Sequence, residues 1–266
     1  MPELPEVETI KRDLEKIILG KKIIEVLIRE PAVIREPASP RFKQGLEGQT
    51  VKNILRRAKV LILELSSGKS LVIHLKMTGQ LVYPGGGDKS RVVFKFSDGE
   101  SMDFNDQRLF AQLRLLDDWR TLKFIKELGP EPLDLTSEKF KALIGSKKTR
   151  IKPLLMDQAF ISGIGNIYAS EVLFRAKINP SRLANSLTDK EKESLLGAIK
   201  EVLREAIKAG GSSVDDYVRL SGEKGDYVRH HRVYGRESKP CFICKALIKK
   251  IVLGGRGTFF CPKCQK

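Results

Sequence analysis

The stretch CFICKALIKKIVLGGRGTFFCPKC, residues 241–264, decides the architecture of the end of the chain. It holds all four cysteines of the chain, as two Cys-x-x-Cys pairs with sixteen residues between them. Each pair supplies two thiolates from one tight turn, and two such pairs at this spacing are typical of a tetrahedral zinc site. We therefore predict one structural zinc ion with four ligands: Cys241, Cys244, Cys261 and Cys264.

The segment between the two cysteine pairs predicts a β-hairpin. Strands are expected over 247–253 and 258–260, with the glycine-rich run 254–257 as the tip. A zinc of this kind holds a hairpin together and performs no chemistry, so a purely structural staple is one interpretation. The basic residues at and near the tip favour a second interpretation, in which the hairpin also binds an anionic partner. Four free or disulfide-bonded cysteines are the remaining alternative.

The charge of the whole chain also indicates an anionic partner. Its 266 residues include 49 Lys and Arg against 33 Asp and Glu, and the net charge of +16 points most simply to nucleic acid. A hydrophobic fraction of 41% excludes general disorder, and the short apolar runs exclude a membrane span. The acidic N-terminus lacks the apolar core of a secretory signal. We therefore expect a cytoplasmic protein whose cysteines bind metal.

Hydrophobic periodicity separates a strand-rich first half from a helical second half. Apolar residues at helical spacing predict a helix over 4–19, and short alternating runs from 22 to 116 predict an antiparallel β-sandwich or barrel. Later helices are expected over 166–174 and from the Thr188–Glu191 capping-box pattern to 206. We expect the following division: a β-sandwich domain 1–129, a linker 130–136, a helical domain 137–235 and the zinc hairpin 236–266.

Six motifs along the chain resemble those of one known family. They are PELPEVET (2–9), RAK (57–59), HLKMTG (74–79), DQRLF (106–110), GIGNIYASE (163–171) and VYGR (233–236). In this order they are similar to the formamidopyrimidine-DNA glycosylases, which are bacterial base-excision enzymes for oxidised purines. The resemblance implies an α+β fold: an N-terminal antiparallel β-sandwich with an N-terminal helix, a helix–two-turn–helix domain, and a C-terminal zinc-finger β-hairpin, with DNA in the cleft between the lobes.

The resemblance makes the N-terminus the catalytic centre. Once Met1 is removed, Pro2 has a free secondary amine, and because α-amino groups have pKa values of about 7.7–8.0, part of it is neutral at pH 7. This amine can attack the sugar C1′, displace the damaged base and leave an iminium that permits strand cleavage. The family implies Glu3 as the general acid at the sugar ring oxygen, Glu6 as an ordering residue and Lys59 as an active-site contact. Without the resemblance, Pro2 and Glu3 suit the first turn of any helix, and Lys59 suits a solvated charge run on a strand.

Further residues match the DNA contacts of the family. Met77, Arg108 and Phe110 match a wedge that fills the space of an extruded base, and the Arg offers donors to the orphaned partner base. Leu109 and Ala111 replace the Arg and Gly that are frequent there, which puts the stiffness of that loop in question. Phosphate contacts are implied for the remaining matches: His74, Lys152, Asn166, Tyr234, Lys250 and Arg256. For an isolated residue of these types, a core position or a solvated charge is the commoner explanation.

Three functions are consistent with these features. The resemblance favours a glycosylase that removes 8-oxoguanine and formamidopyrimidines and cleaves the strand by β,δ-elimination as an AP lyase. The second candidate function is that of an endonuclease VIII-type enzyme for oxidised pyrimidines. Leu4 and the wedge residues favour the oxidised-purine glycosylase over it. A zinc protein that binds DNA without catalysis is the third, and the presence of Pro2 and Glu3 argues against it. The expected partner is duplex DNA with oxidised bases or abasic sites, bound by a monomer at the bacterial nucleoid and not at a membrane.

Overall fold

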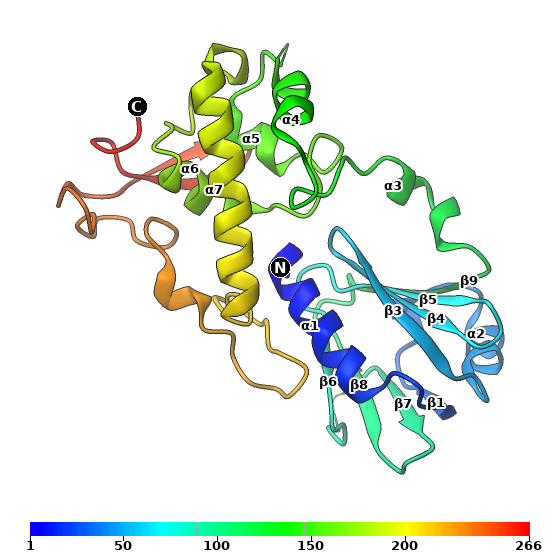
Figure 1. The fold of residues 1–266 in the computed structure, drawn as a ribbon. Coiled ribbons are helices and arrows are strands. Elements are labelled where there is room, and N and C mark those ends of the chain that lie inside the picture. Colours follow the sequence, from blue (N-terminus) through cyan, green and yellow to red (C-terminus); the bar gives the residue numbers. More distant parts are fainter. Residues whose placement is uncertain (89, 146) are drawn as a thin grey trace. The chain divides into compact units, whose positions relative to one another are not determined.

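The computed structural model describes residues 1–88, 90–145 and 147–266 and divides the chain into two compact units. We call Met1–Lys126 with Ala209–Val228 the sandwich unit, and Glu127–Lys208 with Arg229–Lys266 the helical unit. Figure 1 shows the elements of both units along the chain. The chain leaves the sandwich unit after residue 126, forms the helices, and returns to the sandwich unit for the segment 209–228.

The sandwich unit is built on two β-sheets that share one hydrophobic core. One sheet has the strand order β1-β7-β8-β6 and the other β2-β9-β5-β4-β3. Neighbouring strands are antiparallel except for β2 and β9, which run parallel. The predicted antiparallel sandwich is therefore confirmed, with this one parallel pair at a sheet edge. The strands are β1 (Ile23–Ile28), β2 (Ile34–Glu36), β3 (Val51–Arg57), β4 (Val60–Leu65), β5 (Ser70–His74), β6 (Gln80–Val82), β7 (Val92–Phe96), β8 (Ser101–Asn105) and β9 (Gln112–Leu116).

Two helices pack on these sheets. The predicted N-terminal helix is α1 (Leu4–Ile17), which packs against β3 and β4. A second helix, α2 (Ser39–Leu46), lies in a region where the pattern predicts only strands, because two apolar residues in two turns do not make a recognisable helical period. Both helices contribute fully buried side chains to the core: Val7, Ile10, Leu14, Phe42 and Leu46.

Buried side chains and an ion pair hold the segment 209–228 to the sandwich unit. Tyr217 and Leu220 lie in the same hydrophobic core as the strands. Arg219 pairs with Asp13 of α1 at 2.9 Å. The core of the sandwich unit therefore includes residues that follow the longest helix in the sequence, and the domain limits given above stay a prediction.

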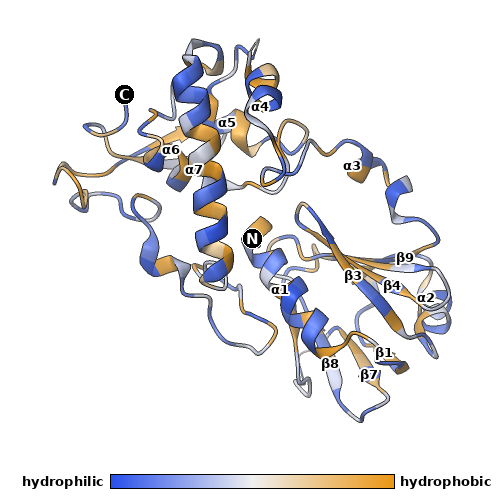
Figure 2. Cartoon of the chain, viewed as in Figure 1, coloured by the Kyte–Doolittle hydropathy of each residue, from blue (hydrophilic) through white to orange (hydrophobic). Residues whose placement is uncertain are grey.

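The helical unit contains α7 (Asp189–Lys208), whose apolar and polar sides are distinct in Figure 2. The predicted capping box is present: the Thr188 N–H donates to Glu191 Oε2 at 2.8 Å, and the Glu191 N–H donates to Thr188 Oγ1 at 3.3 Å. No helix in the described ranges is long and apolar enough to cross a bilayer. The other α-helices of this unit are α4 (Ser137–Ile144), α5 (Ile151–Met156) and α6 (Asn166–Arg175), whereas α3 (Lys123–Lys126) belongs to the sandwich unit. The 3-10 turns of the chain are Pro31–Val33, Trp119–Thr121, Ala184–Ser186 and Tyr227–His230.

The C-terminal hairpin consists of β10 (Lys249–Leu253) and β11 (Arg256–Phe260). Its turn contains only Gly254 and Gly255, with φ of +55° and +71°, and such a two-residue turn of left-handed residues suits the twist of a hairpin. The prediction that Arg256 is part of the tip is wrong, because Arg256 is the first residue of β11 and pairs with Leu253.

Candidate functional site

The residues predicted to be catalytic begin at the first turn of α1, where Pro2 and Glu3 are both buried. Glu3 caps the helix in an extended conformation, and its N–H donates to Glu6 Oε2 at 2.8 Å. The other oxygen of Glu6 accepts the N–H of Ser212 at 2.8 Å. Glu6 thus fixes the backbone next to Pro2 and joins it to the returning segment 209–228.

Lys59 lies in a turn, whereas the sequence pattern places it on a strand. The pairing of Arg57 with Val60 leaves Ala58 and Lys59 as the two-residue connection between β3 and β4, and Ala58 has a φ of +53°. Lys59 is only 7% exposed. This burial excludes the solvated charge run as the explanation for Lys59.

Arg56 ties this turn to the N-terminal helix. Its Nε donates to Glu8 Oε2 at 2.8 Å, and its Nη1 donates to the Ala58 carbonyl at 3.0 Å. Burial opposes ionisation of Glu8, but hydrogen bonds from Arg56 and Arg12 outweigh it and hold the pKa of Glu8 below its usual value. The elements that carry Pro2 and Lys59 are therefore connected by a charged pair.

His74 ends β5 as a half-buried, neutral imidazole. Burial and the nearby positive charges of Lys76 and Lys59 lower the pKa of His74 to about 3. Its Nδ1 accepts the Lys76 N–H at 3.1 Å, so the ring proton lies on Nε2. A neutral ring with this tautomer can donate a hydrogen bond to a phosphate throughout the physiological pH range.

The three wedge residues form one cluster although they come from two loops. Met77 lies between β5 and β6, and Arg108 and Phe110 lie between β8 and β9. The Arg108 Cζ is 4.8 Å from the Phe110 ring centre, and Arg108 Nη1 is 3.4 Å from Met77 Sδ. Met77 is 41% and Phe110 49% exposed, which excludes core packing as their role. Leu109, between the two, has a φ of +56° and packs against the hydrophobic core.

Lys152 does not lie where a phosphate contact would. It is 0% exposed, and its Nζ donates to Asn166 Oδ1 at 2.6 Å, Thr258 Oγ1 at 2.8 Å and the Gly257 carbonyl at 3.1 Å. These acceptors match the three protons of an ammonium, so Lys152 fixes Asn166 and β11 and does not reach a phosphate itself. Because an ammonium only donates, the Asn166 oxygen faces Lys152, and its NH₂ group is the side suited to an anion at the start of α6.

The side chains of Tyr234 and Lys250 both lie beside the aromatic ring of Phe259 in the hairpin. The Tyr234 ring centre is 5.2 Å from that of Phe259, and Lys250 Nζ is 5.7 Å from the Phe259 ring centre. Glu171, fully buried on α6, accepts the Tyr234 N–H at 2.8 Å, and burial raises the pKa of Glu171. Lys250 and Arg256 are exposed on the two strands, as contacts to an anion require.

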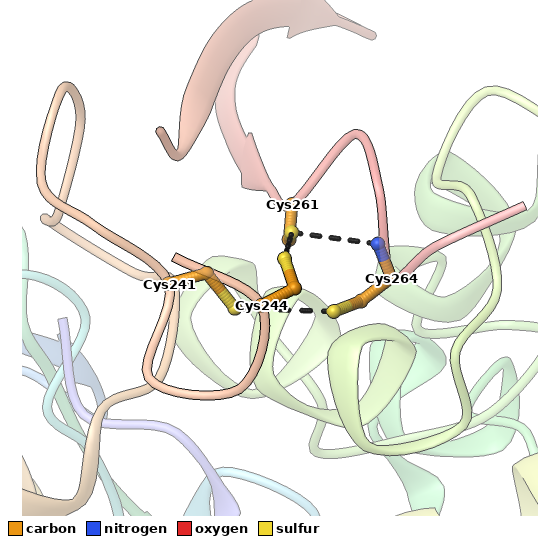
Figure 3. Close-up of side chains that lie close together, drawn as sticks. All are labelled: Cys241, Cys244, Cys261 and Cys264. Atoms are coloured by element: carbon orange, nitrogen blue, oxygen red, sulfur yellow. Dashed lines mark hydrogen bonds between the residues drawn. The ribbon is translucent and has the colours of Figure 1, made fainter. Parts of the chain in front are cut away.

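The four cysteines converge from the two ends of the hairpin, as Figure 3 shows. Their sulfur atoms all lie within 4.8 Å of one another. Cys241 Sγ is 3.9 Å from Cys264 Sγ, and Cys244 Sγ is 3.3 Å from Cys261 Sγ. A zinc ion with four bonds to sulfur of about 2.3 Å requires sulfur separations of about 3.8 Å, so the cysteines fit one tetrahedral zinc.

Comparison with known proteins covers nearly the whole chain. Residues 1–113 match the formamidopyrimidine-DNA glycosylase N-terminal domain, residues 128–218 its H2TH domain, and residues 238–266 the zinc finger found in FPG and IleRS. The formamidopyrimidine-DNA glycosylase of Pelotomaculum thermopropionicum is 44% identical over 274 residues, covering 100% of this chain and 99% of that protein. The chain belongs to the formamidopyrimidine-DNA glycosylase family. The family member of Desulfitobacterium hafniense is 42% identical, with 100% of both chains covered.

Solved structures of formamidopyrimidine-DNA glycosylases share this fold. The MutM (Fpg) protein of Thermus thermophilus is 38% identical with a TM-score of 0.89, covering 99% of this chain and 98% of that chain. Lactococcus lactis Fpg in complex with DNA that contains an abasic site is 36% identical with a TM-score of 0.91, covering 99% of each chain. As a member of this family, the chain is a DNA glycosylase for oxidised purines with AP-lyase activity, and its cysteines hold one structural zinc.

Three acidic residues of this glycosylase have positions that the sequence alone does not assign. Glu8 pairs with Arg56, Glu171 holds the backbone before the zinc finger, and buried Asp106 lies under the wedge. All three fall inside the quoted motifs: Glu8 in PELPEVET, Asp106 in DQRLF and Glu171 in GIGNIYASE. An acid in such a motif that has no chemical role is a signal for a structural carboxylate.

Proposed function

We propose that this glycosylase acts on duplex DNA with Pro2 as its nucleophile. The Lactococcus lactis relatives form complexes with Fapy-dG containing DNA and with abasic-site DNA, and a net charge of +16 suits such a polyanion. The proposed enzyme is a monomer that works in the bacterial cytoplasm on the nucleoid. Its proposed phosphate contacts are His74, Asn166, Tyr234, Lys250 and Arg256.

The reaction starts when removal of Met1 frees the Pro2 nitrogen. Its lone pair forms a bond to the sugar C1′ as the bond from C1′ to the damaged base breaks, and the proton that the Pro2 nitrogen then loses goes to the departing base. Glu3 protonates the sugar ring oxygen, the ring opens, and the nitrogen and C1′ form an iminium. The iminium makes the C2′ proton acidic, so its loss expels the 3′ phosphate, and a second elimination expels the 5′ phosphate.

The remaining active-site residues position the sugar and the backbone. Glu6 holds the Glu3 N–H and the Ser212 N–H, so the acid and the nucleophile keep one geometry. Lys59 places a positive charge beside the sugar-phosphate, and neutral His74 donates from Nε2 to a phosphate. The observation that carries the proposal is the buried, carboxylate-anchored start of α1, which holds Pro2 and Glu3 side by side.

Borohydride trapping on an 8-oxoguanine duplex tests this mechanism. Reduction of the iminium gives a stable amine, so we expect a covalent protein–DNA adduct whose cross-linked peptide contains Pro2. An adduct at Lys59, or base release with no adduct at all, would contradict the proposal. In the same assay, faster single-turnover excision of thymine glycol than of 8-oxoguanine would favour the endonuclease VIII-type alternative.

We expect Arg108→Ala to lower the preference for a lesion opposite cytosine over one opposite adenine. Cytosine offers two adjacent acceptors, O2 and N3, to the donor-only guanidinium, whereas adenine offers one acceptor beside an amino donor. A bidentate contact to a base discriminates by about 1–3 kcal/mol, so the ratio of the two single-turnover rates should fall by about 5- to 150-fold.

Phe110→Ala is the matched control for this measurement, because it removes the ring under Arg108 but no hydrogen-bond donor. It should slow excision opposite both bases and change their ratio much less. If Arg108→Ala slows both substrates equally and keeps their ratio, Arg108 contacts only the backbone.

A further inference from the structure

Asp106 is a buried carboxylate at the base of the wedge, and it is 2% exposed. Its Oδ1 accepts the Thr78 hydroxyl and, at 3.2 Å, the Arg108 N–H. Its Oδ2 accepts the Ala111 N–H at 2.7 Å. Both ends of the short loop that carries Arg108 and Phe110 are therefore bonded to one side chain.

The same carboxylate joins this loop to the loop that carries Met77. Thr78 directly follows Met77, and its hydroxyl donates to Asp106 and accepts the Arg108 N–H at 3.2 Å. Asp106, Thr78 and the Arg108 N–H thus form a closed triangle between the β5–β6 loop and the β8–β9 loop. The residue whose N–H closes this triangle, Arg108, is also the one whose guanidinium contacts Met77 and Phe110.

The loop between the anchored ends is not in a relaxed conformation. Leu109 has a φ of +56°, and the left-handed region is unfavourable by about 1–2 kcal/mol for a residue such as leucine, because its Cβ approaches the following carbonyl oxygen. The hydrogen bonds of Asp106 on either side and the packing of Leu109 against the core offset this cost. Without the carboxylate these hydrogen bonds are lost, and we expect Leu109 to leave the left-handed region. The direction of the Arg108 side chain would then change as well.

We propose that Asp106 is a positioning residue that locks the two wedge loops together and so sets the preference of the enzyme for cytosine opposite the lesion. The inference rests on the proposed role of Arg108 as the reader of the orphaned base. Asp106 itself touches no DNA. It acts through the Arg108 N–H, the Ala111 N–H and the Thr78 hydroxyl, which together fix where the guanidinium points.

Asp106→Asn tests the proposal with almost no change in volume. Every contact of the carboxylate is with a donor, so an amide NH₂ placed at either oxygen position faces a donor. We expect the ratio of excision opposite cytosine to excision opposite adenine to fall about tenfold, the scale of a lost hydrogen bond to a charged group. Cleavage and borohydride trapping at a ready-made abasic site, which need Pro2 but no opposite-base reading, should stay within about threefold.

Thr78→Val and Thr78→Ser form a matched pair that removes or keeps the hydroxyl. Thr78→Val should reproduce the loss of opposite-base preference, and Thr78→Ser should keep the wild-type ratio. This pair keeps the proposal testable if Asp106→Asn fails to fold. A wild-type ratio in a folded Asp106→Asn or Thr78→Val protein overturns the proposal.

The double variant with Asp106→Asn and Arg108→Ala separates this proposal from the role of Arg108. If Asp106 acts through Arg108, the double variant has the same ratio as Arg108→Ala alone. A further fall in the ratio would show that Asp106 acts by another route and would reject the proposal. If Arg108→Ala alone leaves the ratio at its wild-type value, the base-reading role fails first, independently of Asp106.

Discussion

In protein from which Met1 has been removed, Pro2→Gly should lower the rate of 8-oxoguanine excision at least about a hundredfold. This factor is the lower end of what a positioned catalytic group contributes. Glycine keeps an amine, but it is a primary amine, and its imine carries a positive charge only when protonated. The pyrrolidine ring also fixes the direction of the nitrogen lone pair, whereas the amine of glycine rotates freely about its N–Cα bond. Single-turnover excision rates, with mass spectrometry of the N-terminus, measure the effect.

Glu3→Gln is the matched comparison, because it keeps Pro2 and changes only the proposed acid. It should slow base removal more than cleavage of a ready-made abasic site, which needs no base departure. Full glycosylase activity in protein shown to retain Met1 would rule out the amine mechanism, since the Pro2 nitrogen is then part of a peptide bond.

Cys261→Ser should remove the zinc and weaken binding to a duplex with an abasic-site analogue by at least about a hundredfold at moderate salt, since several phosphate contacts depend on the hairpin. Zinc sites of this class contribute apparent free energies of about 10–16 kcal/mol to folding, so we expect the hairpin to unfold when the metal is lost. Its loss also removes β11, which supplies Thr258 and Gly257 to Lys152. Metal analysis and a binding titration measure the two effects.

Lys263→Ala, in the same Cys-x-x-Cys turn, is the control, because Lys263 is exposed and is not a ligand. It should retain one zinc per chain and lose little affinity. A Cys261→Ser protein with one zinc and wild-type affinity would contradict the assigned ligand set. Borohydride trapping at high DNA concentration should still work, since Pro2 lies in the other unit.

Elements whose signal is local could be predicted from the sequence. The Thr188–Glu191 pattern marks the start of α7, and the alternating runs mark β4, β5, β7 and β8. The spacing of the cysteines gives the zinc ligands directly, because all four are close in sequence. The helix α2 is too short for its periodicity to be visible.

Positions that depend on tertiary partners could not be predicted in the same way. Lys152 matches a phosphate-contact position of the family, but only the structure places its ammonium between Asn166 and β11. The alternation of its neighbours assigns Lys59 to a strand, whereas the register of β3 and β4 puts it in their turn. The motif around Asp106 signals a structural carboxylate but does not reveal its partner Thr78, which lies in another loop, 28 residues away in the sequence.

The return of the segment 209–228 to the sandwich unit has a consequence for biosynthesis. Tyr217 and Leu220 belong to a core whose other members are all encoded in the first 115 residues. When only the β-strands have emerged from the ribosome, Tyr217 and Leu220, which complete this core, have not yet been synthesised. The core of the sandwich unit is therefore complete only after α7 and the segment 209–228 have been translated.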